Sequence, residues 1–290
     1  MIPVASCVIC DGAIVKVKQA LVAPFLAERI WKRKPFCVEL VRCTGCGFLF
    51  YNPRLDDEEL QRLYEAYRRE EYLRQRHSSE PWYTEKFNAD LASAPFYAMR
   101  RERLRALLER VLAGRRIERV LDYGGDHGDL VAGLLEGAKA FVYDISGVCP
   151  AEGVASVPVP DTAMADLILS SNVLEHVGFP KVLVQEIARA APKDGLILLE
   201  VPCEEPLGTP RIVRRVAQVA IMSLFHPKLT RHVMRPASLY MMHEHINYFT
   251  EHSLEQLMRS CGISVMASGA YAFSSRAGKA DMAWSLGTKG

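Results

Sequence analysis

The chain has 290 residues, of which 49% are hydrophobic and 24% charged, and this composition excludes an intrinsically disordered protein. Its 36 basic and 34 acidic residues give a formal net charge of +2. The charges are segregated, with 21 basic and 15 acidic residues in 1–116, 5 and 15 in 117–206, and 10 and 4 in 207–290. No apolar run reaches the roughly 18 residues of a membrane span, and the start of the chain lacks the basic residues of a signal peptide, so we expect a cytoplasmic protein of about two domains.

Two Cys-x-x-Cys pairs lie near the amino terminus, Cys7 with Cys10 and Cys43 with Cys46. Each pair places two thiolates on one side of a tight loop, so together they supply the four ligands of a closed tetrahedral metal site. A cytosolic chain is not expected to keep disulfides, and a redox dithiol needs one pair rather than two. The pattern predicts a structural metal, zinc in preference to iron, in a small domain at residues 1–55. The other cysteines are expected to be buried apolar side chains: Cys37, Cys149, Cys203 and Cys261.

Short strands are expected in this domain at residues 36–41 and 48–51, and a helical segment at 56–116 follows it. Acidic residues gather at the start of the stretch 55–76 and arginines at its end, which matches the helix dipole and predicts one helix. A second helix, rich in arginine and leucine, is expected from Pro95 to Ala113.

From residue 117 to residue 290, short apolar runs alternate with helical patterns, which predicts a doubly wound α/β domain with a parallel sheet. Strands are expected to begin near Glu118, Ala140, Asp166 and Gly195. Helices are expected at residues 129–138 and 181–191. A helix at 253–260 and strands from 264 and at 280–286 end the domain.

A glycine-rich turn follows the first strand of this domain. Glycines let the backbone approach a ligand closely, and the start of a helix favours negative charge. Asp122, just before the turn, would repel a pyrophosphate but suits the amino group of a methionine moiety, so S-adenosylmethionine is favoured over NAD. The predicted cofactor-binding residues of this turn are Asp122, Gly124, Gly125 and Gly128.

Three more polar residues lie at the ends of neighbouring predicted strands. Asp144 ends the second strand, 22 residues after Asp122, where a carboxylate can bind both hydroxyls of a ribose. Ser171 and Asn172 end the third strand. All three are predicted to lie at the cofactor site.

An insertion at about residues 207–242 contains no acidic residue. Arg211, Arg214, Arg215 and Gln218 recur at helical spacing and predict a basic amphipathic helix over 211–223. Three interpretations stay open: a lid that binds an anionic acceptor such as a diphosphate, a helix resting on an anionic membrane surface, and a solvated face. Nucleic acid is not expected, because no aromatic residues are interleaved with these arginines. The sequence does not indicate the oligomeric state.

Several stretches in combination resemble the class I S-adenosylmethionine-dependent methyltransferases: VLDYGGDHGDL, YDIS, ADLILSSNVLEHV, GLILLEVP and MHEHINYFTEHSLEQLMRSCGI. The paired cysteines, CGFLFYNPRL and the tyrosine-bearing helix after them resemble the zinc-containing sugar C-methyltransferases. The resemblance implies a Rossmann-like methyltransferase domain with a small N-terminal zinc-binding domain, S-adenosylmethionine as methyl donor and structural zinc. One departure is Asp126, where the class carries a glycine and the sugar enzymes tend to carry asparagine.

The resemblance also implies that His176, Glu244 and His245 serve the acceptor and its proton, with a tyrosine at Tyr67 or Tyr72. Alternatively, His176 only closes a strand–helix turn, or the His-Glu-His run holds a second metal. The expected function is methyl transfer to a small or glycan-type acceptor, such as a nucleotide-linked sugar. Alternatives are an O-methyltransferase of a natural product or polysaccharide, an NAD-dependent oxidoreductase, and a non-catalytic zinc-bearing binding module.

Overall fold

The computed structural model of the chain describes residues 1–67, 69–91, 93–112, 114–275 and 278–290. Contacts between Cα atoms divide it into two compact units, each built from three segments. Unit 1 comprises Met1–Asn88, Glu175–Phe179 and Cys203–Thr250, and unit 2 comprises Ala89–Leu174, Pro180–Pro202 and Glu251–Gly290. The boundaries expected at residues 55 and 116 stay a sequence-based prediction, and the basic insertion groups with the N-terminal segment in unit 1.

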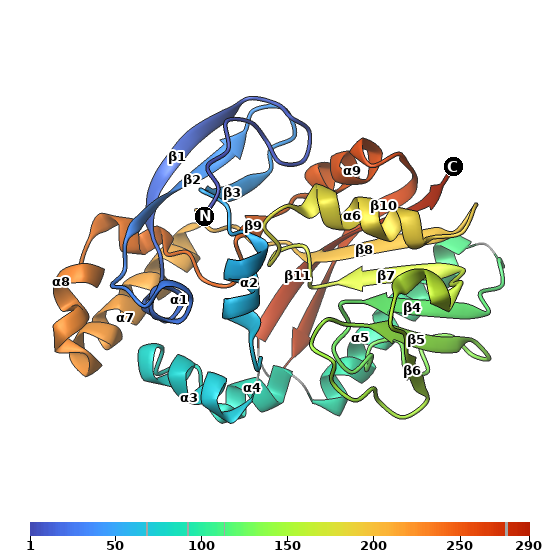
Figure 1. The fold of residues 1–290 in the computed structure, drawn as a ribbon, viewed down its shortest axis with the longest axis horizontal. Helices are drawn as coiled ribbons and strands as arrows, with labels where there is room; N and C mark the ends of the chain where they lie inside the picture. Colours follow the sequence, from blue (N-terminus) through green and yellow to red (C-terminus); the bar gives the residue numbers. More distant parts are fainter. Residues whose placement is uncertain (68, 92, 113, 276–277) are drawn as a thin grey trace. The chain divides into compact units, whose positions relative to one another are not determined.

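Unit 2 is built on a seven-stranded sheet of order β10-β11-β8-β7-β4-β5-β6 (Figure 1). Its strands are β4 (Arg119–Tyr123), β5 (Lys139–Tyr143), β6 (Val154–Ser156), β7 (Leu167–Ser171), β8 (Leu196–Pro202), β10 (Ile263–Ser275) and β11 (Gly278–Lys289). The first five pair in parallel, while β11 pairs antiparallel with both β8 and β10. The chain enters at β4, winds outward to β6 and then continues from β7 on the other side. The prediction of a doubly wound α/β fold is therefore confirmed.

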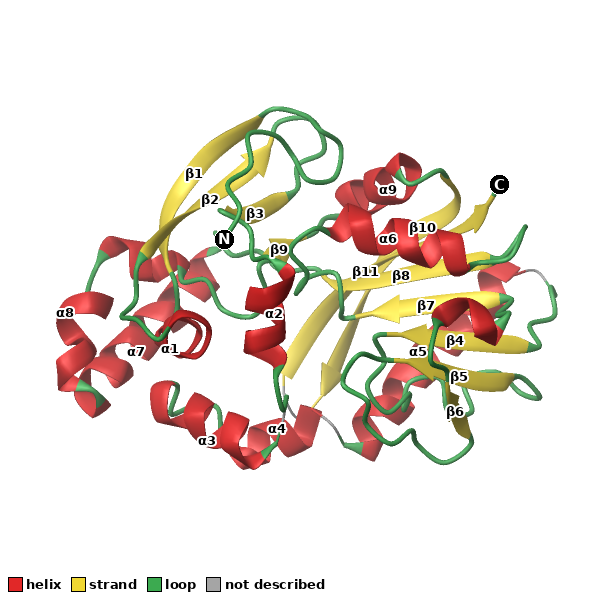
Figure 2. Ribbon diagram, viewed as in Figure 1, coloured by secondary structure: helices red, strands yellow, loops and turns green. Residues whose placement is uncertain are grey.

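The helices of unit 2 cover this sheet because the central strands are apolar on both faces. Its helices are α5 (Ala94–Leu112), α6 (Pro180–Ala190), α9 (Glu251–Ser260) and the short 3-10 helix η1 (Pro160–Ala163). Leu104, Leu107 and Leu108 of α5 share a core with residues of β4, β7 and β8. Helices α6 and α9 lie side by side (Figure 2). The expected end of α5 at residue 113 lies outside the described residues.

The prediction of a helix at residues 129–138 is wrong. This stretch forms successive turns, including hydrogen bonds from Ala132 N–H to Gly128 O and from Leu134 N–H to Val131 O. Gly133 and Gly137 have φ of +67° and +75°. These left-handed conformations interrupt a helix, and glycine adopts them without a steric penalty, so the apolar spacing alone was misleading.

Unit 1 contains an antiparallel sheet of order β1-β2-β3-β9. The strands are β1 (Ile14–Leu21), β2 (Cys37–Cys43), β3 (Leu49–Asn52) and β9 (Asn247–Tyr248). The two strands expected from the sequence match β2 and β3, whereas β1 was not anticipated. Strand β9 comes from a distant part of the chain and pairs Tyr248 with Leu49.

The helices of unit 1 surround a second core, which includes Phe25, Leu40, Tyr51 and Tyr72. They are α1 (Pro24–Trp31), α2 (Asp57–Tyr64), α3 (Glu70–Ser79), α7 (Thr209–Phe225) and α8 (Thr230–Val233), with the 3-10 helices η2 (Pro227–Leu229) and η3 (Pro236–Tyr240). The chain passes from unit 1 to unit 2 within α4 (Glu85–Leu91).

The single helix predicted over 55–76 is divided into α2 and α3. A capping box of Asp56 and Glu59 starts α2, as the acidic start suggested. The chain then leaves the helix after Tyr64, and Ala66 adopts a left-handed φ of +49°. The prediction was wrong here because charge pattern alone does not reveal this interior break.

Candidate functional site

The four paired cysteines converge in unit 1 at the end of the small sheet. The Sγ atoms of Cys7 and Cys46 are 3.7 Å apart, and those of Cys10 and Cys43 are 3.5 Å apart. All four sulfurs lie within 4.8 Å of one another. Gly12 lies close against them, since a Cβ there would be 3.2 Å from the Cys43 sulfur. The arrangement has the size of a tetrahedral thiolate site.

The remaining cysteines do not behave as predicted. Cys37 and Cys149 are exposed, and Cys203 and Cys261 are partly buried. The prediction of four buried apolar thiols is therefore wrong. Cys37 is the first residue of β2, and its side chain is exposed while that of the next residue, Val38, is buried.

Asp122 is the penultimate residue of β4 in unit 2 and is buried beside the glycine turn. Burial raises the pKa of its carboxyl to about 7, with further raising by Asp144, although Arg100 acts in the opposite direction. A Cβ at Gly125 would lie 2.2 Å from Cγ of Asp122, so only glycine fits at this turn. Gly124 and Gly128 have φ of +77° and +75°, which also favours glycine.

Asp126 occupies the position where the methyltransferase class carries a glycine, and its φ is +55°. Aspartate and asparagine tolerate this left-handed region better than other side chains, which accounts for the substitution. The Asp126 N–H donates to Oδ2 of Asp144 at 2.9 Å, and the Ser146 N–H donates to Oδ1 at 2.8 Å. The predicted ribose-binding carboxylate is thus oriented by the backbone of the turn.

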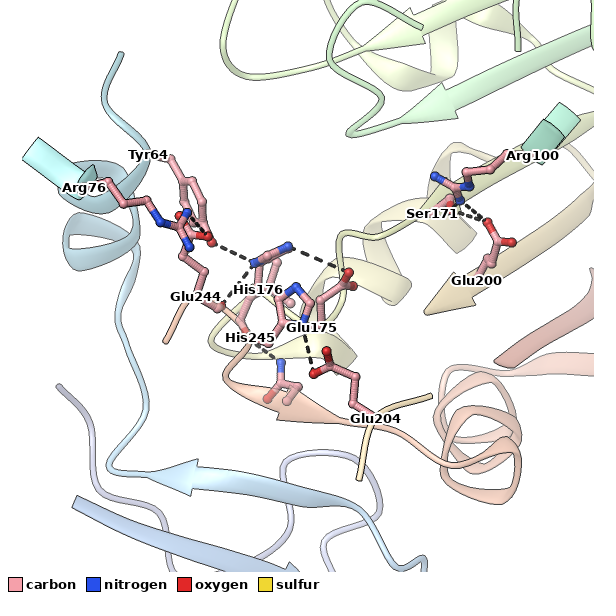
Figure 3. Close-up of polar contacts among 12 residues, drawn as sticks. Tyr64, Arg76, Arg100, Ser171, Glu175, His176, Glu200, Glu204, Glu244 and His245 are labelled. Atoms are coloured by element: carbon pink, nitrogen blue, oxygen red, sulfur yellow. Dashed lines mark hydrogen bonds and ion pairs between the residues drawn. The ribbon is translucent and has the colours of Figure 1, made fainter. Parts of the chain in front are cut away.

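Ser171 is the last residue of β7, and Asn172 directly follows it at the same edge of the sheet. Arg100 of α5 donates to Oε2 of Glu200 at 2.6 Å and to Ser171 Oγ at 2.5 Å (Figure 3). Ser171 and Tyr271 both donate to the Glu200 carboxylate. The Asn172 N–H donates to Glu200 O at 3.1 Å. The sequence did not predict this buried Arg100–Glu200 pair, because its partners lie 100 residues apart.

The three predicted catalytic residues lie together in unit 1 (Figure 3). His176 Nδ1 is 2.9 Å from the Tyr64 hydroxyl and 3.1 Å from the carbonyl oxygen of Glu244. The carbonyl can only accept a hydrogen bond, whereas the hydroxyl can donate or accept, and Nε2 of the same ring lies 3.8 Å from Oε1 of Glu175, so these contacts are compatible with either tautomer. Burial, and then the nearby charge of His245, lower the pKa of His176 to about 3, so the ring is neutral.

His245 has the opposite charge state. Burial alone would lower its pKa, but the Glu204 carboxylate, 3.1 Å from Nδ1, outweighs burial and raises the pKa to about 9. Glu204 also accepts from Arg211 of α7 at 3.1 Å. The rings of His176 and His245 pack edge to face, with centroids 4.8 Å apart. A neutral and a protonated histidine therefore stand side by side.

The Glu244 carboxylate accepts hydrogen bonds from Tyr72 and Arg76. Burial would raise its pKa, but Arg76 and Tyr72 lower it, so this buried carboxylate is ionised. Of the two tyrosines considered from the sequence, Tyr72 thus contacts a predicted catalytic residue. Tyr64, which contacts His176, was not singled out.

Arg54 fixes the loop that carries His176. Its buried guanidinium donates to Gly178 O at 2.8 Å and to Tyr51 O at 2.8 Å. A Cβ at Gly178 would lie 2.1 Å from Leu55 O, so the loop needs glycine there. Neither residue was predicted, although Arg54 directly follows the Asn-Pro that ends the cysteine-bearing stretch.

Helix α7 confirms the predicted amphipathic helix and shows which side is inward. Arg215 is buried, and its Nη1 donates to Nε2 of His243. His243 in turn donates from Nδ1 to Glu80 at 2.8 Å. Arg211 and Arg215 therefore belong to the same polar network as Glu204 and the histidines.

The strand order of unit 2, with an acidic residue and a glycine turn after β4, defines a methyltransferase-like class of α/β protein. A family described as a methyltransferase domain matches residues 96–268, which is more than half of the chain. The chain belongs to this family, and the prediction of an S-adenosylmethionine-dependent methyltransferase rather than an NAD-dependent oxidoreductase is confirmed.

Comparison with curated proteins finds no match. Among solved structures, 1,6-didemethyltoxoflavin-N1-methyltransferase of Burkholderia thailandensis, with bound S-adenosylhomocysteine, is 16% identical with a TM-score of 0.49, over 87% of this chain and 95% of that chain. Magnesium protoporphyrin IX methyltransferase of Synechocystis, with bound S-adenosylmethionine, is 13% identical with a TM-score of 0.46, over 81% and 99%. A possible histamine N-methyltransferase of Thermotoga maritima is 15% identical with a TM-score of 0.45, over 74% and 100%.

Among the described residues, no helix has the length and apolar character needed to span a bilayer.

Proposed function

We propose that this chain transfers a methyl group from S-adenosylmethionine to an anionic small-molecule or glycan-type acceptor. The observation that carries the proposal is Asp122, a buried carboxyl at the glycine turn whose pKa is raised to about 7. A ligand with an ammonium and a sulfonium would add positive charge to that of Arg100 and would stabilise the ionised form of this carboxyl. Asp122, Gly124 and Gly125 would hold the methionine moiety. Asp144 would hold the ribose, and Ser171 and Asn172 would line the same edge.

When bound, the donor supplies an electrophilic methyl, and the departing sulfur takes the bonding electron pair. The chain's task is to orient the acceptor and to receive its proton. The neutral ring of His176 would receive this proton. His245, protonated at neutral pH, donates a hydrogen bond to an oxygen of the acceptor and balances its charge. Glu244 positions both histidines through its anchorage to Arg76 and Tyr72.

The acceptor's negative charge is inferred from the arginines turned inward on α7. Arg211 and Arg215 bring two positive charges to the histidine cluster. Among the described residues, Glu204 is the one carboxylate that accepts a hydrogen bond directly from Arg211. Guanidinium groups bind phosphate and carboxylate well because they present several N–H donors in a fixed plane. A nucleotide-linked sugar, with its diphosphate, suits this charge, and C-methylation of such a sugar is the specific form of the proposal.

We also propose that Cys7, Cys10, Cys43 and Cys46 hold one structural zinc. Zn–S bonds of about 2.3 Å in a tetrahedron place the sulfurs about 3.8 Å apart, close to the 3.5 Å and 3.7 Å observed for two pairs. Four thiolates complete the coordination, so the metal would stabilise the small sheet without taking part in the reaction.

The test is a panel of sugar nucleotides incubated with S-adenosylmethionine and followed by mass spectrometry. A product heavier by one methylene, lost in His245→Ala and kept in His252→Ala, would support the site, because His252 is exposed on α9. Unchanged turnover in His245→Ala would refute the role of His245. Solvent deuterium incorporated at a ketosugar carbon without the donor indicates C-methylation, and a methylated product without such exchange indicates O-methylation.

A further inference from the structure

Helix α7 presents its apolar side to solvent. Arg215 and Met222, which lie on one face, are buried, whereas Val213, Leu224 and Phe225 are 64%, 78% and 68% exposed. A surface helix normally buries its apolar face and exposes its charged one. Here the arginine-bearing face contacts the polar cluster of unit 1, so the apolar face is left uncovered.

The exposed apolar residues form a continuous stripe along the helix. Their spacing of three and four residues places them on one side over about four turns. A stripe of this kind differs from the isolated exposed apolar side chains that are common on soluble proteins. We define the α7 stripe as Val213, Val216, Ala217, Ala220, Ile221, Leu224 and Phe225, all exposed.

Basic residues flank the α7 stripe. Between Pro206 and His243 the chain has six basic residues and no acidic one. Arg211 and Arg215 point inward, but the other four are exposed, and in the described part of the chain no ion pair links them to a carboxylate. Helix α8 packs on α7 through the bond from Thr230 Oγ1 to Ser223 O, which places the basic residues near the end of the stripe. The four flanking cations are Arg214, Lys228, Arg231 and Arg235.

We propose that the α7 stripe lies on an anionic membrane surface, parallel to the bilayer plane. Aliphatic side chains and a phenylalanine would enter the boundary between headgroups and acyl chains, and the four cations would contact anionic headgroups. A second copy of this chain is a poorer occupant, because stripe-to-stripe association would bring the unpaired cations of both copies together. The positive charge of the four flanking residues therefore favours an anionic lipid surface.

The experiment is flotation of the 290-residue chain, purified in the presence of zinc, with vesicles of phosphatidylglycerol and of phosphatidylcholine. Binding to phosphatidylglycerol that weakens with salt is expected, with little binding to phosphatidylcholine. Phe225→Ser and Leu224→Ser should each weaken binding about tenfold or more. Lys228→Gln and Arg231→Gln should each weaken it about fivefold. Val182→Ser, which replaces a 53% exposed residue of α6 in unit 2, should leave binding unchanged.

Equal binding to both lipids, or no binding to either, would overturn the proposal. So would full binding by Phe225→Ser, or a concentration-dependent dimer in light scattering that Leu224→Ser abolishes. Binding of S-adenosylmethionine by calorimetry serves as the check that each variant is folded. Should a stripe variant fail that check, the exposed charge variants Lys228→Gln and Arg231→Gln decide the result.

Discussion

Asp122→Asn should make the protein more stable and at the same time weaken donor binding. Asp122 is buried, and its pKa is raised to about 7, whereas an unfolded aspartate titrates near about 3.9. The folded state therefore binds a proton that the unfolded state releases, and stability falls as pH rises from about 4 to about 7. Three pKa units correspond to about 4 kcal/mol, which is the upper limit of the gain at pH 8.

Urea unfolding at several pH values measures this gain. The difference between Asp122→Asn and the parent should approach its maximum above pH 7, shrink to about 1.5 kcal/mol at pH 5, and vanish below about pH 4. Asp161→Asn, an exposed substitution in η1, is the matched control and should change stability by less than about 0.5 kcal/mol.

The same substitution should have the opposite effect on the affinity for S-adenosylmethionine, which it should weaken. A cationic ligand selects the ionised carboxylate, so the affinity of the parent for S-adenosylmethionine should fall about tenfold per pH unit below pH 7 and level off above it. Asp122→Asn should bind at least about tenfold more weakly at pH 8 and lose this dependence. Calorimetry showing a parent affinity that is flat from pH 5.5 to 8.5 would refute the reasoning, as would a variant less stable than the parent at pH 8.

Three further outcomes follow from the contacts. Arg100→Met leaves Glu200 buried without its cation and should lower the free energy of unfolding in urea by about 3–5 kcal/mol. Much of this loss should be recovered when Glu200→Leu is added, and an unchanged midpoint for the single variant would contradict the pairing. Glu204→Gln should lower the pKa of His245 from about 9 toward or below its ordinary value, as seen by NMR titration, and a pKa that stays near 9 would mean that another group holds the proton. Cys43→Ser should lower the zinc content from one equivalent and reduce the thermal midpoint of unit 1, and full zinc retention by this variant would exclude the four-cysteine site.

The sequence carried most information where the chemistry is local. The glycine turn after β4 could be found because a strand, an acid and glycines lie within a few residues of one another. The Arg100–Glu200 pair and the Tyr64–His176 contact could not, because their partners come from separate segments whose approach depends on packing. The helical spacing of charged and apolar residues also predicted the two faces of α7, but it did not show which face is turned inward. The usual rule would bury the apolar face, and two acids, the buried Glu80 and the partly exposed Glu204, explain why the arginines turn inward instead.

Unit 1 is assembled from chain segments that leave the ribosome at very different times. The pairing of Leu49 with Tyr248 joins strands 199 residues apart. At about 5–20 residues per second, β3 waits on the order of 10–40 s for β9. The four cysteines, by contrast, are all available once residue 46 has emerged, so zinc binding would order the segment that carries them early. In this way a metal bound by the cysteines would protect an unpaired strand edge from aggregation until the rest of its sheet is synthesised.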